Sequence, residues 1–332
     1  MQTHRAGKPA AYPDQAIYAA FACRALGLRF ADLDGGSGLA FRVSSPTRSV
    51  AFGGGRCSYY PQNNATAATL ANDKYLTNVV LDGAGIAHCG GRYFFLTDRH
   101  RAHRPSGHDS ADAVAYLRDL GGRAFVKPLT GSRGDFAEAI GSETALAAYL
   151  DDVAPHYDSV LMQPVYAGRE YRLFLLDDDL VYSARKYPPV LVGDGVTPLR
   201  DLLARREQDL HAHGVSSATA AIGEADDARV LTVGEQYPLH GRLNRSAGGA
   251  MVFETPRLRD RAVAQARAAM RALGLRAAGV DLFTDLAGDA DAIRVIEVNA
   301  NPAIRFLEDS GRDDLILTIW RHTLSAAGLL DV

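Results

Sequence analysis

A short apolar strand near the C-terminus carries two oxygen ligands on one face. Within 294–302, side chains alternate between the two faces of the strand, so Glu297 and Asn299 point the same way, while Ile296 and Val298 point the other way. A carboxylate and an amide at the end of a buried strand are costly without a partner. A hard cation such as Mg²⁺, which prefers oxygen ligands, would be that partner. The segment therefore predicts a metal site.

The size and charge of the chain exclude several classes of protein. With 332 residues, 47% of them apolar and 23% charged, the chain can bury a sizeable core and form two or three lobes. The net charge of −3 gives no reason to expect nucleic acid or a membrane surface as a partner. No apolar run approaches the roughly 20 residues that a membrane-spanning helix needs.

The cysteines and the N-terminus indicate the cell compartment. Cys23, Cys57 and Cys89 lie far apart and lack the spacing of a metal or redox motif, so we expect three reduced thiols. No N-terminal stretch combines a positive start with a long apolar core, as a secretion signal would. These features predict a cytoplasmic protein.

The order of apolar patterns indicates an α+β fold. We expect a small N-terminal lobe (1–70), a central subdomain (71–160) and a C-terminal subdomain (161–332). Antiparallel hairpins are prominent among mixed helices and strands, which argues against one doubly wound sheet. Helices are expected at 18–28, 65–82, 112–120, 144–152, 198–211, 256–273 and 315–327, strands at 39–43, 49–52, 124–128, 159–164, 171–176, 180–186, 278–284 and 292–298, and a surface excursion at 212–228.

One hairpin brings a third oxygen ligand to the C-terminal strand. Folding the chain at about 286–291 places Asp281 opposite residues 295–297, so Asp281, Glu297 and Asn299 converge. Three protein ligands with open positions suit a metal–nucleotide complex, because Mg²⁺ usually combines one or two carboxylates with water and phosphates. The alternative is a set of solvated residues at the strand ends.

Cationic residues upstream could meet an anion at this metal. Lys127 ends an apolar strand and is followed by Gly131, Ser132 and Gly134, whose backbone N–H groups could bind phosphate. Lys74 is a second cation of this kind. The spacing differs from that of a Walker A loop. Each lysine, taken alone, fits a solvated surface position equally well.

Two further segments supply donors. In the hairpin centred on Asp178, Arg172 and Lys186 share a face next to Arg185, and two cations side by side repel unless an anion joins them. That anion could be a ligand or a neighbouring carboxylate such as Glu170. A later loop holds Arg242, Asn244, Gly248 and Gly249, where the glycines permit close approach of backbone to ligand; a plain surface loop is the alternative.

The order of these segments resembles the ATP-grasp carboxylate–amine ligases, in particular the ATP-grasp region of cyanophycin synthetase, glutathione synthetase-like and RimK-like ligases. The resemblance covers about residues 62–310. Each matching block is weak alone, and six blocks in the family's order make a specific pattern. The blocks are 71–74 with 84–86, 126–129, 168–172, 192–195, 244–249, and 279–281 with 297–302.

The resemblance implies a role for each matching residue. It implies an ATP-grasp fold with ATP held between two α+β lobes. Lys74 and Lys127 would hold the ATP phosphates together with the loop of Gly131, Ser132 and Gly134, the hinge at Gln163 and Val165 would contact adenine, and Glu170 would bind the ribose. Catalytic contacts to the transferred phosphate and acyl phosphate would come from Arg172, Lys186, Arg242 and Asn244, Mg²⁺ ligands would be Asp281, Glu297 and Asn299, and substrate contacts would be Arg185, Gly248, Gly249 and Arg305.

Three features depart from the family pattern. The phosphate loop has fewer glycines than many relatives. Lys186 stands where relatives more often carry Arg, so a bidentate contact would be lost, and Arg185 could compensate. The chain also ends soon after the metal motif and lacks the second halves of the bifunctional relatives, which suggests a free-standing enzyme.

The resulting hypothesis is an ATP- and Mg²⁺-dependent ligase that joins a carboxylate to an amine through an acyl phosphate, with amino acids or short peptides as substrates. Two metal ions are expected, with Mn²⁺ as an alternative. Nucleic acid and membranes are not expected as partners, and a homodimer is left open. Two alternatives remain: an ester- or thioester-forming ligase, and a non-catalytic ATP-binding module.

Overall fold

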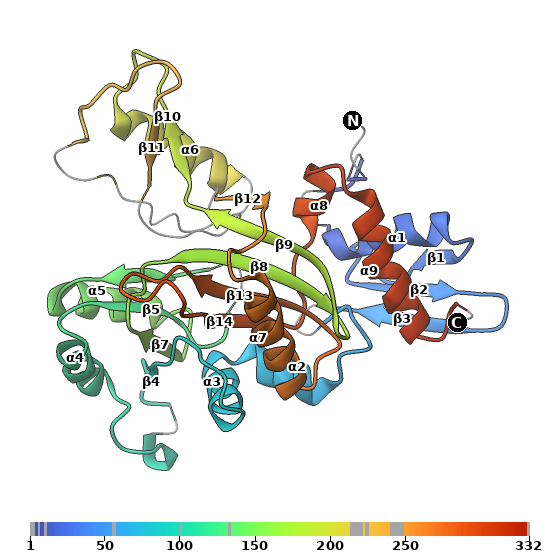
Figure 1. Cartoon of the computed structure of the whole chain (residues 1–332), viewed down its shortest axis with the longest axis horizontal. Helices are drawn as coiled ribbons and strands as arrows, with labels where there is room; N and C mark the ends of the chain where they lie inside the picture. The colour runs from blue at the N-terminus through green and yellow to red at the C-terminus, as the bar shows by residue number, and fades with distance from the viewer. Residues whose placement is uncertain are drawn as a thin grey trace.

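The computed structural model describes residues 4–5, 7–9, 12–54, 58–99, 101–131, 134–212, 222, 226–239 and 249–330. A five-stranded antiparallel sheet forms the centre of the molecule (Figure 1). Its strand order is β12 (Ala250–Phe253), β9 (Asp179–Tyr187), β8 (Arg169–Leu176), β13 (Ala277–Thr284) and β14 (Arg294–Asn299). The two expected hairpins, β8–β9 and β13–β14, are therefore neighbours, because β8 pairs with β13.

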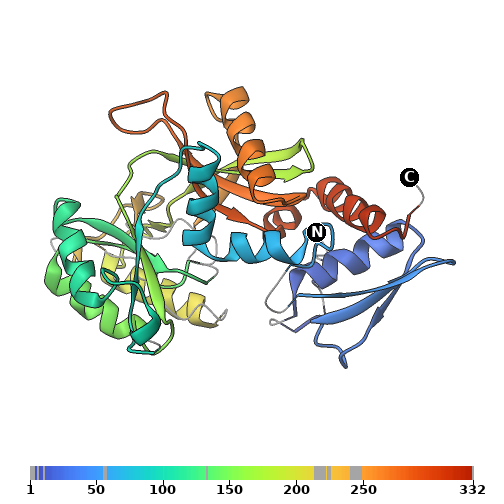
Figure 2. The same ribbon diagram turned by 90° about the horizontal axis from the view of Figure 1, so that it is seen from below.

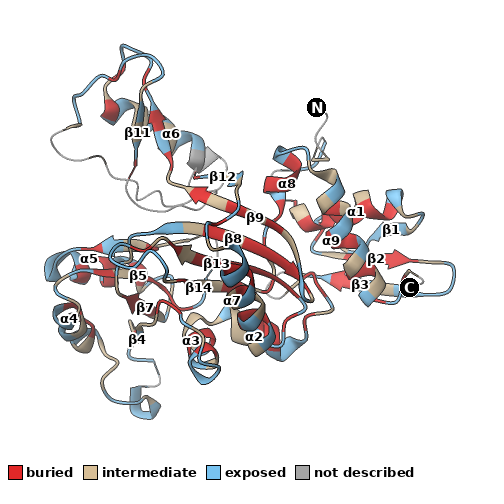
Figure 3. Ribbon diagram, in the orientation of Figure 1, coloured by how far each residue is buried: buried red, intermediate tan, exposed pale blue. Residues whose placement is uncertain are grey.

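One face of this sheet is covered by α2 (Ala65–Asn72), α3 (Lys74–Gly83) and α7 (Arg259–Ala272). Side chains of β8 and β13 that point to this face, such as Leu173 and Val280, are fully buried against small residues of α2 and α7. Small residues let the helices approach the sheet closely. Figure 3 shows how burial concentrates along the central strands β8 and β13.

A second, four-stranded sheet forms its own lobe. Its strand order is β4 (Arg92–Phe95), β7 (Ser159–Gln163), β5 (Ala124–Pro128) and β6 (Glu138–Ile140). The helices α4 (Ser110–Asp119) and α5 (Glu143–Val153) cover its outer face, and a single 3₁₀ turn spans Arg101–His103. The lobe is joined to the rest of the chain by the segment before β4 and by the hinge after β7.

The N-terminal lobe contains α1 (Asp14–Ala25) and a sheet of β1 (Arg29–Asp32), β2 (Ala40–Ser44) and β3 (Ser49–Gly53). The C-terminal helices α8 (Arg305–Asp309) and α9 (Asp313–Ala326) pack on it, with the indole of Trp320 buried between Phe41, Phe52 and Tyr60. Figure 2 shows this lobe and the four-stranded lobe at opposite ends of the molecule.

A smaller extension projects from β9. It holds β10 (Val190–Val192), β11 (Gln236–Pro238) and α6 (Leu199–Ala212), packed around Leu191, Leu199, Leu231 and Leu239 (Figure 1, yellow-green). Most of the surface excursion expected at 212–228 lies outside the described residues.

The α+β class expected from the sequence is confirmed, as are the main hairpins. The cores do not follow the expected chain segments. The helices α2 and α3 share a core with the five-stranded sheet, and the end of the chain shares one with α1. The short strands β1, β4, β6, β10, β11 and β12 and the helix α8 were not expected. Among the described residues, no helix is long and apolar enough to cross a membrane.

Candidate functional site

The free face of the five-stranded sheet carries a cluster of charged residues, referred to below as the charged face. Asp281 on β13 lies opposite Glu297 of β14 on one side and Arg172 of β8 on the other. Glu170 lies two residues before Arg172, and Lys186 lies two residues beyond the partner of Arg172 on β9. Since strand side chains alternate, all five point to the same face. The expected register of both hairpins is confirmed.

Asp281 is the centre of this cluster. Its Oδ1 accepts a hydrogen bond from Nε of Arg172 at 2.7 Å, and its Oδ2 accepts one from the Arg172 Nη2 and one from the Lys186 Nζ, each at 2.7 Å. Lys186 also pairs with Glu170. The Asp281 side chain has no exposed surface and that of Lys186 has 4%. The carboxylates that the sequence left open as partners of these cations are thus present.

Burial and charge compete over the protonation of the cluster. Burial alone would raise the pKa of Asp281, but Arg172 and Lys186 outweigh it and hold this pKa well below its usual range. Burial would likewise lower the pKa of Lys186, and Asp281 and Glu170 outweigh it and raise that pKa. For Glu170 burial wins, and its pKa is raised despite Lys186. Glu170 is therefore the carboxyl of this set that protonates first as the pH falls.

Glu297 and Asn299 form the second part of the charged face. The Asn299 amide donates to Oε1 of Glu297 at 3.2 Å and to the Gly279 carbonyl at 3.3 Å. This leaves the amide oxygen of Asn299 and the second carboxylate oxygen of Glu297 as ligands for a hard cation. Asp281 fits such a cation less readily, because both of its oxygens already bind cationic side chains. The described residues hold no group of three or more His, Cys, Asp or Glu residues able to bind a metal.

The two expected phosphate lysines lie near Glu297. Lys74 is the first residue of α3, and its Nζ donates to the Gly131 carbonyl at 3.2 Å, so the helix is docked on the phosphate loop. Burial lowers the pKa of Lys74 to about 8; Glu297 opposes this shift and Lys127 adds to it. Lys127, on β5, is 5% exposed. The structure thus brings both lysines, from different lobes, within electrostatic range of the charged face.

The charges of this region do not balance without an anion. Four cations (Lys74, Lys127, Arg172 and Lys186) meet three carboxylates (Glu170, Asp281 and Glu297). A region with excess positive charge and free donors favours a multiply charged anion such as a polyphosphate.

The expected hinge also adopts a suitable place. Gln163 ends β7 and is 3% exposed, and its side-chain amide donates to the Gly90 carbonyl at 2.5 Å. Val165 is 37% exposed. The side chain of Gln163 is used to hold the two segments that join the lobes, which leaves recognition of a base to the backbone.

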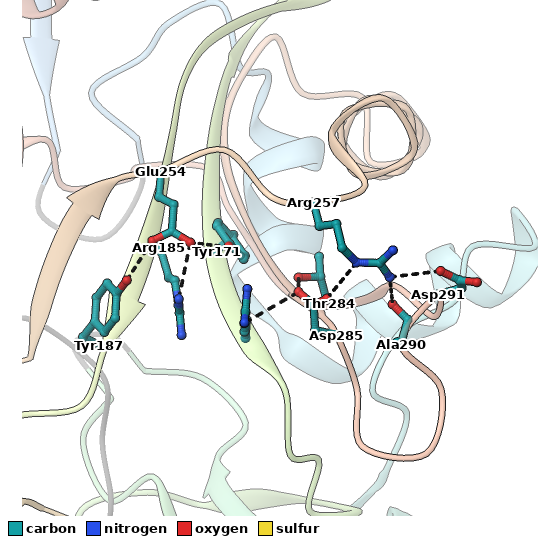
Figure 4. Close-up of polar contacts among 10 residues, drawn as sticks. Tyr171, Arg185, Tyr187, Glu254, Arg257, Thr284, Asp285, Ala290 and Asp291 are labelled. Atoms are coloured by element: carbon teal, nitrogen blue, oxygen red, sulfur yellow. Dashed lines mark hydrogen bonds and ion pairs between the residues drawn. The ribbon is translucent and has the colours of Figure 1, made fainter.

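Arg185 lies on the opposite face of the sheet. It pairs with Glu254 at 3.3 Å and packs on the Tyr187 ring, and both Tyr171 and Tyr187 donate to Glu254 at 2.7 Å (Figure 4). This group is referred to below as the Glu254 knot. Arg185 therefore cannot take over from Lys186, as the sequence had suggested. Neighbouring residues of a strand point to opposite faces, so alternation alone excludes it.

The remaining expected residues are divided between two situations. Arg305 is an exposed residue at the start of α8, and within the described residues no hydrogen bond or ion pair joins it to the charged face. Gly249 is buried directly before β12. Ser132, Arg242, Asn244 and Gly248 lie outside the described residues.

Two residues near the charged face were missed. Tyr182 lies on β9, on the same face as Lys186, and its buried hydroxyl has no hydrogen-bond partner among the described residues. The same alternation could have found it. Cys89 is buried near Lys127 and Glu170, and burial raises the pKa of its thiol to about 12. The thiol is therefore protonated at neutral pH, which excludes a ready nucleophile.

Comparisons with known proteins agree with this arrangement. The chain is 28% identical over 259 residues to the cyanophycin synthetase of Geminocystis herdmanii, a match that covers 71% of this chain and 28% of that protein. It is 25% identical over 262 residues to the glutathione biosynthesis bifunctional protein of Enterococcus faecalis, covering 73% and 33%. The D-alanine–D-alanine ligase of Bacillus anthracis superposes with a TM-score of 0.51 at 14% identity, over 80% of this chain and 71% of that one.

The chain has the ATP-grasp fold. The resemblance expected from the sequence is confirmed by these relatives and by this structural neighbour. No family model matches the chain. The chain spans about a third or less of the length of these two curated relatives, so it corresponds to one part of them.

Proposed function

We propose that the protein is an ATP-dependent carboxylate–amine ligase that joins amino acids or short peptides. The observation that carries the proposal is the buried cluster of Arg172, Lys186 and Asp281 beside Glu297 on a face that two lysines approach. Buried ion pairs are weak sources of stability, so a cluster of this kind is better explained by a charged ligand. The amide-forming relatives supply the class of acceptor.

The reaction would proceed in two displacements. A carboxylate oxygen of the first substrate attacks the γ-phosphorus of ATP, the bond to the bridging oxygen breaks, and ADP leaves with the electron pair. The nitrogen lone pair of the amine then attacks the acyl carbon, the bond to phosphate breaks, and the nitrogen gives up a proton. The products are an amide, ADP and phosphate.

The side chains would act by position and charge. Lys74 and Lys127 bind the phosphates of ATP, and the hinge at 163–165 contacts the base through its backbone. Arg172 and Lys186 stabilise negative charge on the transferred phosphoryl group and on the acyl phosphate, as preorganised donors do in a dry site. Asp281 and Glu170 hold these two cations in place. Asn244 and Arg242 would complete the set from the loop before β12.

Glu297 and Asn299 would hold one or two Mg²⁺ ions, since their free oxygens suit a hard cation. When bound, the metal neutralises phosphate charge and orients the triphosphate. Asp281 would contribute through Oδ1, which accepts a single hydrogen bond. We assign Arg172 and Lys186, rather than the metal, to the acyl oxygen.

The deciding experiment replaces Glu297 by Gln. We expect ADP formation with ATP, Mg²⁺ and a mixed amino-acid pool to fall about 10²- to 10³-fold, the effect of losing one electrostatic contact to the transition state. The exchange keeps the shape of the side chain, so the fold should persist. The matched control is Glu143→Gln, since Glu143 is a surface residue paired with Arg118.

Undiminished ADP formation by the Glu297 variant would refute the metal assignment. Product mass spectrometry with amines, alcohols and thiols identifies the acceptor. Turnover that depends on an alcohol or thiol, with no response to any amine, would exclude amide formation. Tight binding of ATP without turnover for any pair of substrates would favour a non-catalytic module.

A further inference from the structure

A second cavity lies behind the hinge and is not part of the charged face. Its volume is about 610 Å³, within the range of small-molecule sites. It is lined by α3, by residues 86–92, by α4, and by Pro164 and Tyr166 of the hinge. None of the lysines or carboxylates assigned to ATP and metal lines it. We refer to it as the rear cavity.

Two guanidinium groups give the rear cavity its character. Arg92 lies over the ring of Tyr116, with its Cζ 5.2 Å from the centroid, and Arg294 lies over the ring of Tyr166 at 5.3 Å. Each makes one hydrogen bond to a backbone carbonyl, Arg92 to Gly107 and Arg294 to His88. No carboxylate pairs with either of them within the described part of the chain. Since a guanidinium has five N–H donors, each retains donors for a ligand.

The two halves of this arrangement converge. Burial raises the pKa of Tyr116, Arg92 opposes this shift, and the phenol of Tyr166 adds to it. Residues of α4 and of the hinge therefore face the same space. Two planar cations held by aromatic faces match the planar geometry of a carboxylate.

The opposite wall carries a negative group. Asp82 of α3 lines the cavity with a side chain that is 74% exposed, and one of its oxygens accepts from His88 at 2.8 Å. Its other oxygen can accept from a ligand. Tyr75 of the same helix adds an aromatic surface between these ends. The cavity thus offers cations at one end, a carboxylate at the other and aromatic surface between them.

We propose that the rear cavity is an effector site for a free amino acid or short peptide. The carboxylate of the ligand binds Arg92 and Arg294, and its ammonium group binds Asp82. The ligand touches both segments that join the four-stranded lobe to the rest of the molecule, residues 88–91 and the hinge. Its binding is therefore linked to the relative position of the lobes, and so to the affinity for nucleotide. Only this last point rests on the proposed function.

The test measures binding of individual L-amino acids and dipeptides by calorimetry, with and without a non-hydrolysable ATP analogue and Mg²⁺. We expect at least one to bind the nucleotide-saturated protein and to change the dissociation constant of the analogue at least threefold. Replacing Arg92 and Arg294 together by Gln should weaken this ligand at least tenfold. The control is Arg123→Gln, an exposed Arg of the same lobe that does not line the cavity.

The amino group is tested separately. The same acid without its amino group should bind at least tenfold more weakly than the amino acid, and Asp82→Asn should remove this difference while keeping the bond to His88. Equal affinities in the unaltered protein would refute the assignment of an amino acid.

Three other results would overturn the proposal: no binding by any compound, competition with the nucleotide analogue, or affinity unchanged in the Arg92/Arg294 variant. An unaltered nucleotide affinity would refute the effector role. Failure of the protein to bind the analogue would count against the proposed function, while the measurements without nucleotide would still test the cavity.

Discussion

The five-stranded sheet carries a charged group on each face, and strand β9 contributes to both. On one face, Lys186 contacts two carboxylates and Arg172 contacts one of them, in a setting where Asp281 has no exposed surface. On the other face, Arg185 belongs to the Glu254 knot, where a single carboxylate accepts from two phenols and one guanidinium and is 31% exposed (Figure 4).

The difference between the faces separates function from structure. The Glu254 knot satisfies its one carboxylate at low desolvation cost, as expected of a structural contact that joins β8, β9 and the segment after β12. The charged face holds several charges out of water and keeps an excess of cations. Replacing such buried pairs by apolar groups is often neutral or stabilising, so stability alone does not explain them.

The strongest test exchanges the two neighbours on β9. Lys186→Met should reduce ADP formation about 10²- to 10³-fold, because it removes a preorganised cation from the transferred phosphoryl group. It should also destabilise the protein by about 3–5 kcal/mol, the cost of breaking a buried ion pair. Arg185→Met should leave turnover within about threefold, since a surface change away from the site has small effects.

Both variants are assayed below their thermal unfolding midpoints, so that loss of fold and loss of activity are separated. Lys186→Arg keeps the charge and should retain most of the turnover. Equal losses for the Lys186 and Arg185 variants would contradict the distinction between the faces.

A smaller effect should come from pH. The pKa of about 8 that burial gives Lys74 means that kcat/KM for ATP should fall as pH rises above about 8, because the neutral amine no longer attracts phosphate. Lys74→Arg stays charged and should move this alkaline limb out of the measurable range. A limb that is unchanged by this substitution would show that another group titrates.

The same shift affects folding with a definite sign. The folded pKa of Lys74 is below its ordinary value of 10.5, so between pH 8 and 10.5 the unfolded chain binds more protons than the folded one. This group alone therefore makes the free energy of unfolding rise with pH over that window. Comparing the pH dependence of thermal unfolding in the unaltered protein and in Lys74→Met isolates the contribution.

The smallest effect is expected from the Glu254 knot. Glu254→Gln removes the charge that strengthens three hydrogen bonds and should lower the free energy of unfolding by about 1 kcal/mol, with kcat unchanged. Thermal unfolding and ADP formation are measured on the same preparation. A fall in kcat without loss of stability would assign the knot to catalysis instead.

The sequence allowed the local geometry of the site to be predicted. Alternation and hairpin register correctly placed Asp281 opposite Glu297, and Arg172 and Lys186 on one face, because both depend only on short-range pairing. Alternation would also have excluded Arg185 and pointed to Tyr182. These residues needed no knowledge of the rest of the chain.

Other features depend on contacts between distant segments. The docking of Lys74 on the carbonyl of Gly131 joins a helix to a loop of another lobe. The rear cavity needs Arg294 of β14 beside the hinge and Tyr116 of α4. Short edge strands such as β6 and β12 carry too few residues for a periodic signal, and their pairing is decided by the neighbouring strand.

The chain by itself therefore determined which side chains share a face, since a strand alternates with a fixed period of two. Only the tertiary structure decided how those faces are used. It neutralised Asp281 with Arg172 and Lys186, turned Arg185 toward Glu254, and placed two unpaired guanidiniums behind the hinge. Charge balance and burial are sums over all neighbours in space, and those neighbours come from segments that the sequence separates by up to about a hundred residues or more.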